Sequence, residues 1–181
     1  EKTEVVVLPE MFSTGFSMQP ELFAETMSAQ SGTDGETVAW MKRVSKENGI
    51  IITGSIIIEE GGKYFNRLVW MLPNGQYGYY DKRHLFAYGE EDKHYSAGNK
   101  RLIASVKGWK INLQICYDLR FPVWARQQAK EDETEFDVLI WVGFCTGTTS
   151  TQSSCSSSKA FSTTSTQSSC SSSKAFSTTI S

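Results

Sequence analysis

Short apolar runs bounded by glycine, proline or asparagine divide the first part of the chain, and their pattern predicts β-strands. The runs are rich in β-branched and aromatic residues, which suit the pleated, half-buried surface of a sheet. The predicted strands cover residues 5–8, 50–58, 64–72, 76–81, 102–106, 109–115 and 137–142. The strands at 102–106 and 109–115 form a hairpin-like pair about Lys107-Gly108.

A helix is predicted between the first two strands. Thr33-Asp34-Gly35-Glu36 fits a capping box with Thr33 as the N-cap. Apolar residues then recur on or near one face, at Val38, Met41 and Val44. The helix should extend to about Lys46 and end at Asn48-Gly49.

A second helix is predicted from Pro122 to about Glu131, because proline is favoured near the first turn of a helix. Several of the strands are apolar on both faces, and helices lie between them. This arrangement indicates an α/β or mixed α+β layered fold.

The end of the chain has a different composition. Residues 148–162 and 163–177 are identical, and both are almost entirely serine and threonine. Each repeat offers only one alanine and one phenylalanine, besides its cysteine, for packing, which cannot offset the entropy lost on ordering. We therefore expect a core domain at residues 1–147 and a disordered tandem repeat at 148–181, the product of a duplication or of an artefact.

Composition and charge exclude several classes of protein. The 181 residues have a formal net charge of -2, which does not favour nucleic acid or an anionic membrane as a partner. No apolar run approaches the ~20 residues needed to span a bilayer, and no signal peptide is recognisable. The four cysteines lack CxxC spacing, so neither a zinc site nor a disulfide scaffold is expected, and the predicted location is the cytoplasm.

Three residues with reactive side chains directly follow predicted strands. Cys116 lies where a strand leads into a turn and a helix, an outline similar to a nucleophile elbow, in which the Tyr117 N–H could bind an oxyanion. Glu10 follows the first strand, where desolvation would raise its pKa and suit it to act as a base. Lys82 could face a developing negative charge and would lower the pKa of a nearby thiol.

Each of these residues also has a purely structural interpretation. Cys116 could be a buried core cysteine. Glu10 and Lys82 could be solvated side chains in loops, and Glu91 could belong to a surface acidic run. His84 and His94 leave open a Cys–His hydrolase, although no sequence around Cys116 matches that class.

Together these segments resemble the nitrilase, or carbon–nitrogen hydrolase, superfamily, and most of all its omega-amidase branch with the 2-oxoglutaramate amidases. The resemblance covers residues 4 to about 142. It is carried by LPEMFSTGF at 8–16, YDKRHLF at 80–86 and ICYDLRFP at 115–122, with YFNR at 64–67 and YSAG at 95–98 in the same order.

The resemblance implies a four-layer αββα sandwich, pairing into dimers, with neither metal nor organic cofactor. It assigns the catalytic triad to Glu10, Lys82 and Cys116, and a second active-site glutamate, which positions water, to Glu91. The implied reaction is hydrolysis of a small ω-amide such as 2-oxoglutaramate through a Cys116 thioester. Arg83, Phe65 and Trp141 are weaker candidates for shaping the pocket.

The two ends depart from the family pattern. A complete member would begin with a further strand and helix before Val5 and continue well beyond Val142, so we expect a sandwich that is incomplete at both ends. Missing strands would expose apolar sheet and unpaired edges. A catalytically inactive fragment, or a non-enzymatic partner of an intact homologue, is therefore an alternative to an active amidase.

Overall fold

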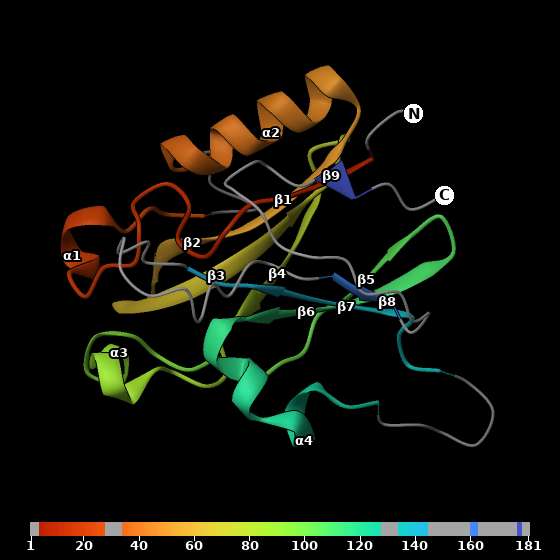
Figure 1. Cartoon of the computed structure of the whole chain (residues 1–181). Coiled ribbons are helices and arrows are strands. Elements are labelled where there is room, and N and C mark those ends of the chain that lie inside the picture. Colours follow the sequence, from red (N-terminus) through yellow and green to blue (C-terminus); the bar gives the residue numbers. More distant parts are fainter. Residues whose placement is uncertain (1–3, 28–33, 128–133, 145–159, 163–176, 179–181) are drawn as a thin grey trace, which may run out of the picture.

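Two β-sheets packed face to face form the centre of the computed structural model (Figure 1). The structure describes residues 4–27, 34–127 and 134–144, together with the backbone of 160–162 and 177–178. The first sheet has the order β4 (Tyr77–Asp81), β3 (Lys63–Met71), β2 (Ile51–Glu60), β1 (Val5–Val7) and β9 (Ser177–Thr178). The second has the order β5 (Ile103–Val106), β6 (Trp109–Ile115), β7 (Val138–Val142) and β8 (Ala160–Ser162).

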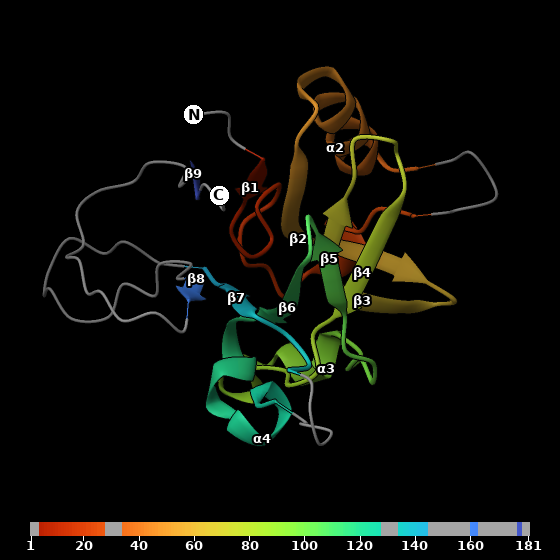
Figure 2. The ribbon, with the colours of Figure 1, turned by 90° about the vertical axis from the view of Figure 1, so that its right-hand side faces the viewer.

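The helices lie around these sheets. They are α1 (Pro20–Phe23), α2 (Glu36–Asn48), α3 (Glu91–His94) and α4 (Pro122–Ala125), with 3₁₀ helices η1 (Ala87–Gly89) and η2 (Cys116–Arg120). Helix α2 covers the outer side of the first sheet, whereas α3 and α4 lie at the opposite end of the molecule (Figures 1 and 2). The layered α/β arrangement agrees with the predicted fold class.

Each sheet contains one parallel pair of strands, and a helical segment connects the two strands of each pair. β1 pairs in parallel with β2 through α2, and β6 pairs in parallel with β7 through η2 and α4. Parallel neighbours require such a crossover, whereas the hairpins β2–β3, β3–β4 and β5–β6 are antiparallel. Both crossovers leave the sheets at strand ends, where the candidate residues lie.

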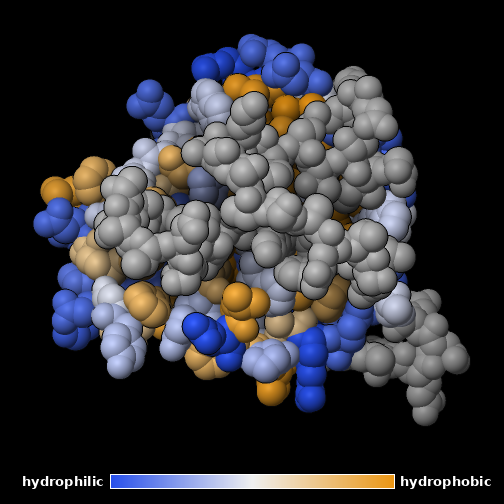
Figure 3. Space-filling view, viewed as in Figure 1, coloured by the Kyte–Doolittle hydropathy of each residue, from blue (hydrophilic) through white to orange (hydrophobic). Residues whose placement is uncertain are grey.

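The main hydrophobic core lies between the sheets. Its buried members come from both, and they include Leu68, Trp70 and Tyr80 facing Ile111, Leu113 and Ile115. A second cluster joins α2 to the outer face of the first sheet through Val38 and Met41. The outward side of α2 is mainly hydrophilic, at the top of Figure 3. Burial on both faces explains why residues 51–58 of β2 are buried without interruption.

The predicted start of α2 is wrong by two residues. The N-cap is Gly35, and the helix begins at Glu36. The Glu25 carboxylate, from a segment earlier in the chain, accepts the Thr37 N–H at 2.9 Å. It thus satisfies a free N–H at the start of the helix, the function predicted for the capping box. Thr33 itself lies outside the described residues. The helix ends at Asn48, followed by Gly49 with a φ of 62°, as the glycine predicted.

The second predicted helix is also shorter than expected, because α4 stops at Ala125 and Arg126 has extended backbone. The side chain of Gln127 then accepts the N–H groups of Glu135 and Phe136, which directs the chain toward β7. Residues 128–131 of the predicted helix lie outside the described part of the chain. The turns η1 and α3 were not predicted, since no apolar period marks them.

Two short strands fall within the Ser/Thr-rich tract. β8 pairs antiparallel with β7, and β9 pairs antiparallel with β1. The rest of the tract lies outside the described residues, so its disorder and the proposed domain boundary remain predictions. In the described part of the chain, no helix has the length and apolar character needed to cross a bilayer.

Candidate active site

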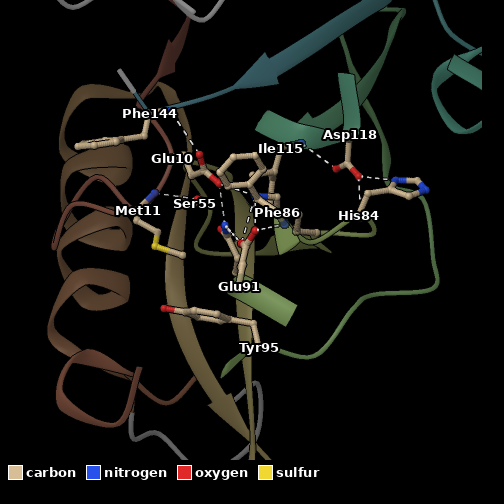
Figure 4. Close-up of polar contacts among 12 residues, drawn as sticks. Glu10, Met11, Ser55, His84, Phe86, Glu91, Tyr95, Ile115, Asp118 and Phe144 are labelled. Carbon is tan, nitrogen blue, oxygen red and sulfur yellow. Dashed lines mark hydrogen bonds and ion pairs between the residues drawn. The ribbon is translucent and has the colours of Figure 1, made fainter. Parts of the chain in front are cut away.

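The ends of strands from both sheets bring the predicted residues together. Glu10 follows β1 and Lys82 follows β4 in the first sheet, whereas Cys116 follows β6 in the second. Lys82 Nζ lies 2.8 Å from Glu10 Oε1 and 2.8 Å from Glu91 Oε2. Figure 4 shows the side chains of Glu10 and Glu91 pointing toward each other. Residues that are up to 106 positions apart in the chain, Glu10 and Cys116, thus form one site.

Glu10 is buried, and its carboxylate is fully engaged. Oε1 accepts hydrogen bonds from Lys82 Nζ and from Asn66 Nδ2 at 2.9 Å, and Oε2 accepts one from the Phe144 N–H at 3.2 Å. The interpretation of Glu10 as a solvated strand-end residue is therefore wrong. Its orientation is fixed in part by the next residue, Met11, whose φ of 45° turns the chain sharply after β1.

A single serine holds that turn. Ser55 Oγ accepts the Met11 N–H at 2.8 Å, and the Ser55 carbonyl accepts the Phe12 N–H at 3.1 Å. The adjacent Gly54 allows the turn to lie against β2, because a Cβ there would be 2.7 Å from Leu8 Cβ. Ser55 and Gly54, a polar residue and a glycine inside an otherwise apolar strand, therefore hold and make room for the segment that carries Glu10.

Lys82 is fully buried and remains an ammonium. Burial by itself would lower its pKa, but the negative charges of Glu10 and Glu91 outweigh that effect and raise the pKa above its ordinary value. The backbone of Lys82 is held on both sides, by its N–H to the Asn66 carbonyl and by its carbonyl to the Gly98 N–H, both at 2.9 Å. Lys82 is thus a fixed buried cation, and the alternative of a solvated loop residue is wrong.

Glu91 begins α3 and points inward, away from the exposed Glu90 and Asp92. Its Oε2 accepts the Phe86 N–H at 2.6 Å, and both of its oxygens contact Lys82 Nζ. Glu91 is fully buried, so it does not belong to a surface acidic run. Two carboxylates therefore flank one ammonium.

Cys116 opens η2 with a φ of 42°, a strained conformation for a residue other than glycine. The thiol is half-buried. Burial, the negative charge of Glu10 and a hydrogen bond to Glu10 raise its pKa to about 12, against the opposing effect of Lys82. Lys82 does lower the pKa of the thiol, as expected, but burial first and the negative charge of Glu10 second outweigh its effect, so the net pKa is raised.

Tyr117 follows Cys116 in η2, and its ring lies edge-on to Phe86 and Phe121, with centroids 5.1 and 5.5 Å away. On the other side of the site, the ring of Phe16 lies 5.7 Å from Lys82 Nζ and stacks with Phe144 at 6.3 Å. Aromatic side chains from separate segments thus pack beside Lys82 and around Tyr117.

Asn66 is a member of the site that the sequence analysis did not single out. Its Nδ2 donates to Glu10 at 2.9 Å and to Glu91 at 3.1 Å. It is fully buried in β3, between Phe65 and Arg67. The available signal in the sequence was its place in the YFNR block. In the structure, its amide donates to both carboxylates and so holds Glu10 and Glu91 close to each other.

The weaker candidates have other contacts. The exposed Arg83 donates to the Gly98 carbonyl at 3.0 Å, and Phe65 lies 5.4 Å from the Arg67 guanidinium. Trp141, on β7, has a buried indole N–H without a hydrogen-bond partner among the residues that the structure describes.

Neither histidine forms a dyad with Cys116. His84 Nδ1 lies 2.8 Å from Asp118 Oδ1, and its ring stacks on Phe121 at 3.7 Å between centroids. His94 is exposed on α3. Among the described residues, no group of three or more His, Cys, Asp or Glu side chains could hold a metal ion. The arrangement is instead a thiol beside a buried carboxylate–ammonium–carboxylate set.

Comparisons with known proteins show what the whole chain is similar to. The chain is 37% identical over 139 residues to omega-amidase YafV of Escherichia coli K12. The matched region covers 77% of this chain and 50% of that protein. It is 31% identical over 127 residues to 2-oxoglutaramate amidase of Bacillus subtilis, covering 68% of this chain and 47% of that protein. The chain therefore spans about half the length of these curated relatives.

A solved structure gives the same result for the fold. XC1258 from Xanthomonas campestris, a CN-hydrolase superfamily protein, superposes with a TM-score of 0.71 and 43% identity, over 77% of this chain and 52% of that one. The architecture is the mixed α/β nitrilase-like fold. The carbon–nitrogen hydrolase family model matches residues 1–162. By this match, by its relatives and by its fold, the chain belongs to the carbon–nitrogen hydrolase family.

Proposed function

We propose that the site hydrolyses the carbon–nitrogen bond of a small ω-amide through a thioester on Cys116. The observation that carries the proposal is the buried set of Glu10, Lys82 and Glu91, whose charges act on the Cys116 thiol. A carboxylate in contact with a thiol can remove its proton, and a fixed ammonium can stabilise an oxyanion.

In the first half of the reaction, Glu10 accepts the Cys116 proton as sulfur attacks the amide carbonyl carbon. The oxyanion of the tetrahedral intermediate is bound by Lys82 and by the backbone N–H of Tyr117. Glu10 returns the proton to the nitrogen, the C–N bond breaks, and ammonia leaves a thioester behind. A positioned general base of this kind contributes roughly 10²–10⁴-fold to the rate, and one oxyanion donor contributes roughly 10²–10³-fold.

In the second half, water replaces ammonia. Glu10 takes a proton from a water molecule that Glu91 positions, the water attacks the thioester, and the acid is released as the Cys116 thiol is restored. Covalent catalysis divides one difficult displacement into two easier ones. Because Lys82 is held between both carboxylates, the same ammonium serves both tetrahedral intermediates.

The substrate class rests on the relatives that are named omega-amidase and 2-oxoglutaramate amidase. We expect ammonia release from 2-oxoglutaramate or succinamate, measured with a coupled glutamate dehydrogenase assay. Cys116→Ala should abolish it. Acid-quenched samples should contain protein heavier by one acyl group, and Cys116→Ala should not.

The competing hypothesis is a folded chain without catalysis, since the chain spans about half the length of its relatives. That hypothesis predicts neither ammonia nor acyl adduct from a monodisperse sample. Such a result over a panel of small ω-amides would reject the proposal. The Cys–His hydrolase, which predicts that His84→Ala or His94→Ala abolishes activity whereas Lys82→Ala does not, is not favoured, because His84 pairs with Asp118 and His94 is exposed.

A further inference from the structure

The carboxylate of Asp118 is fully buried at the centre of η2, and the mechanism above does not use it. It accepts four hydrogen bonds. Oδ2 accepts the Tyr80 hydroxyl at 2.7 Å and the Ile115 N–H at 3.1 Å, and Oδ1 accepts the His84 N–H at 2.9 Å and contacts His84 Nδ1 at 2.8 Å. Four donors meet the full acceptor capacity of a carboxylate, which a buried charge requires.

These four donors come from the two segments that carry the reactive groups. Figure 4 shows the contacts of Asp118 with Ile115 and with His84. Ile115 directly precedes Cys116, whose φ of 42° marks the start of the turn. Tyr80 and His84 lie two residues before and two residues after Lys82. One carboxylate therefore connects the end of β6 in the second sheet to the end of β4 in the first.

The Lys82 side of this connection is reinforced by Tyr80. Burial, the charge of Asp118 and the hydrogen bond to Asp118 all raise the pKa of Tyr80, so its hydroxyl stays a donor. The same oxygen accepts the Arg83 N–H at 3.2 Å and the Trp124 Nε1–H at 3.0 Å. The segment around Lys82 is thus bound to η2 and α4 through a single buried network.

We propose that Asp118 is a positioning residue that fixes the Cys116 turn and the Lys82 segment relative to each other across the two sheets. The inference rests on the proposed function for its meaning in catalysis. Displacing a reacting group by about 1 Å can cost about 100-fold in rate, so loss of the Asp118 hydrogen bonds should lower kcat.

Asp118→Asn tests the proposal with almost no change in shape. An amide has one acceptor oxygen, so either orientation of Asn places its NH₂ against a backbone N–H. One orientation breaks the bond to Ile115, on the Cys116 side, and the other breaks the bond to His84, on the Lys82 side. Asp137→Asn is the matched control, because Asp137 accepts the Lys110 N–H at 2.8 Å near the opposite end of β6.

Activity is the first readout. At temperatures well below unfolding, Asp118→Asn should lower kcat about 10–100-fold with KM changed less than about threefold. Asp137→Asn should keep the kcat of the unchanged protein. Equal kcat losses in the two variants, or unchanged kcat in a folded Asp118→Asn protein, would overturn the proposal.

Alkylation of Cys116 is the second readout, and it needs no amidase activity. Iodoacetamide labelling at pH 8, followed at the Cys116 peptide by mass spectrometry, should be at least about fivefold faster in Asp118→Asn, because a released turn exposes the thiol. Asp137→Asn should leave it unchanged. If the unchanged protein releases no ammonia, the proposed function fails, but this labelling comparison still decides the role of Asp118.

If Asp118→Asn does not fold, Tyr80→Phe takes its place. It removes only the hydroxyl and leaves the Ile115 contact intact. We expect kcat to fall about 3–10-fold and labelling of Cys116 to rise. Wild-type values for both in a folded Tyr80→Phe protein would overturn the proposal.

Discussion

The thiol of Cys116 is protonated at neutral pH, and this decides how it can be activated. Its pKa is raised to about 12 by burial first and by the charge of Glu10 second, while Lys82 acts in the opposite direction. An isolated thiolate is therefore not the resting nucleophile. The proton must pass to Glu10 as sulfur attacks, which makes the carboxylate and its hydrogen bonds part of the nucleophile.

The charge of Glu91 gives a direct test of this balance. Glu91 raises the pKa of Cys116, so Glu91→Gln should lower it, because removing a negative charge favours the thiolate. The alkylation rate of Cys116 should keep rising with pH beyond pH 9 in the unchanged protein and should begin to rise at lower pH in the variant.

Glu90→Gln is the matched control, since Glu90 is exposed and pairs with Lys93 at 2.5 Å. Its labelling profile should overlay that of the unchanged protein. A Glu91→Gln profile that moves to higher pH would contradict the assigned sign of the interaction.

A second residue-scale prediction concerns Ser55, whose hydroxyl accepts the Met11 N–H next to Glu10. Ser55→Ala leaves that buried N–H without a partner and should reduce stability by about 1–3 kcal/mol. It should also lower kcat, because the turn that orients Glu10 loses its anchor. Urea unfolding and ammonia release measure the two effects.

Ser45→Ala separates these effects. Ser45 is equally buried, but its hydroxyl donates to carbonyl groups of Ile50 and Met71, beside α2. We expect a comparable loss of stability with kcat retained. Loss of kcat in both variants would mean that any buried hydroxyl matters equally, and that Ser55 has no special relation to Glu10.

At the scale of elements, the end of β4 is held by the close approach of another backbone. A Cβ on Gly98 would lie 2.2 Å from the Asp81 carbonyl oxygen, and the Gly98 N–H donates to the Lys82 carbonyl. Gly98→Ala must therefore push the Lys82 segment away. We expect a loss of about 1–3 kcal/mol in stability and a lower kcat, measured by urea unfolding and ammonia release.

Gly78→Ala, within β4 itself, is the control for Gly98→Ala. Its Cβ would meet only the flexible end of Leu102, at 3.2 Å, which can move aside. Its kcat should be close to that of the unchanged protein. If Gly98→Ala behaves like Gly78→Ala, the approach of residues 81 and 98 does not fix Lys82.

The sequence was informative about elements wherever burial produced a pattern. Strands β1 to β7 were predicted within one or two residues, because strands such as β2, β3 and β6 are covered on both faces and their apolar runs are long. Strands β8 and β9 were not predicted, since they lie in the tract for which disorder was expected. The segment between Lys82 and Ile103 was left without elements. It is held by single contacts, such as Glu91 to Phe86, which leave no period in the sequence.

The same distinction applies to the site. Glu10, Lys82 and Cys116 could be predicted because each stands at a strand end within a recognisable block. Ser55 and Asp118 could not, because a polar residue in an apolar strand or turn does not reveal its partner. The raised thiol pKa was also beyond prediction, since it depends first on how deeply the folded chain buries Cys116 and then on the nearby charge of Glu10.

At the scale of the whole molecule, the site exists only while the two sheets stay packed. Glu10 and Lys82 belong to one sheet and Cys116 to the other, and the core between the sheets is the main hydrophobic cluster. Unfolding of that core should therefore remove the site at the same time. The site and the core should behave as one cooperative unit.

Leu113→Ala tests this unity. Leu113 is fully buried between the sheets, so truncating it should lower the free energy of unfolding by about 2–5 kcal/mol. Tryptophan fluorescence, which follows the core, and the rate of Cys116 alkylation, which follows the site, should shift together to lower urea concentration. Leu119→Ala, at a residue that is 55% exposed in η2, should shift neither probe. If the alkylation transition stayed in place while the fluorescence transition moved, the site would be held by local contacts such as those of Asp118, rather than by the packing of the two sheets.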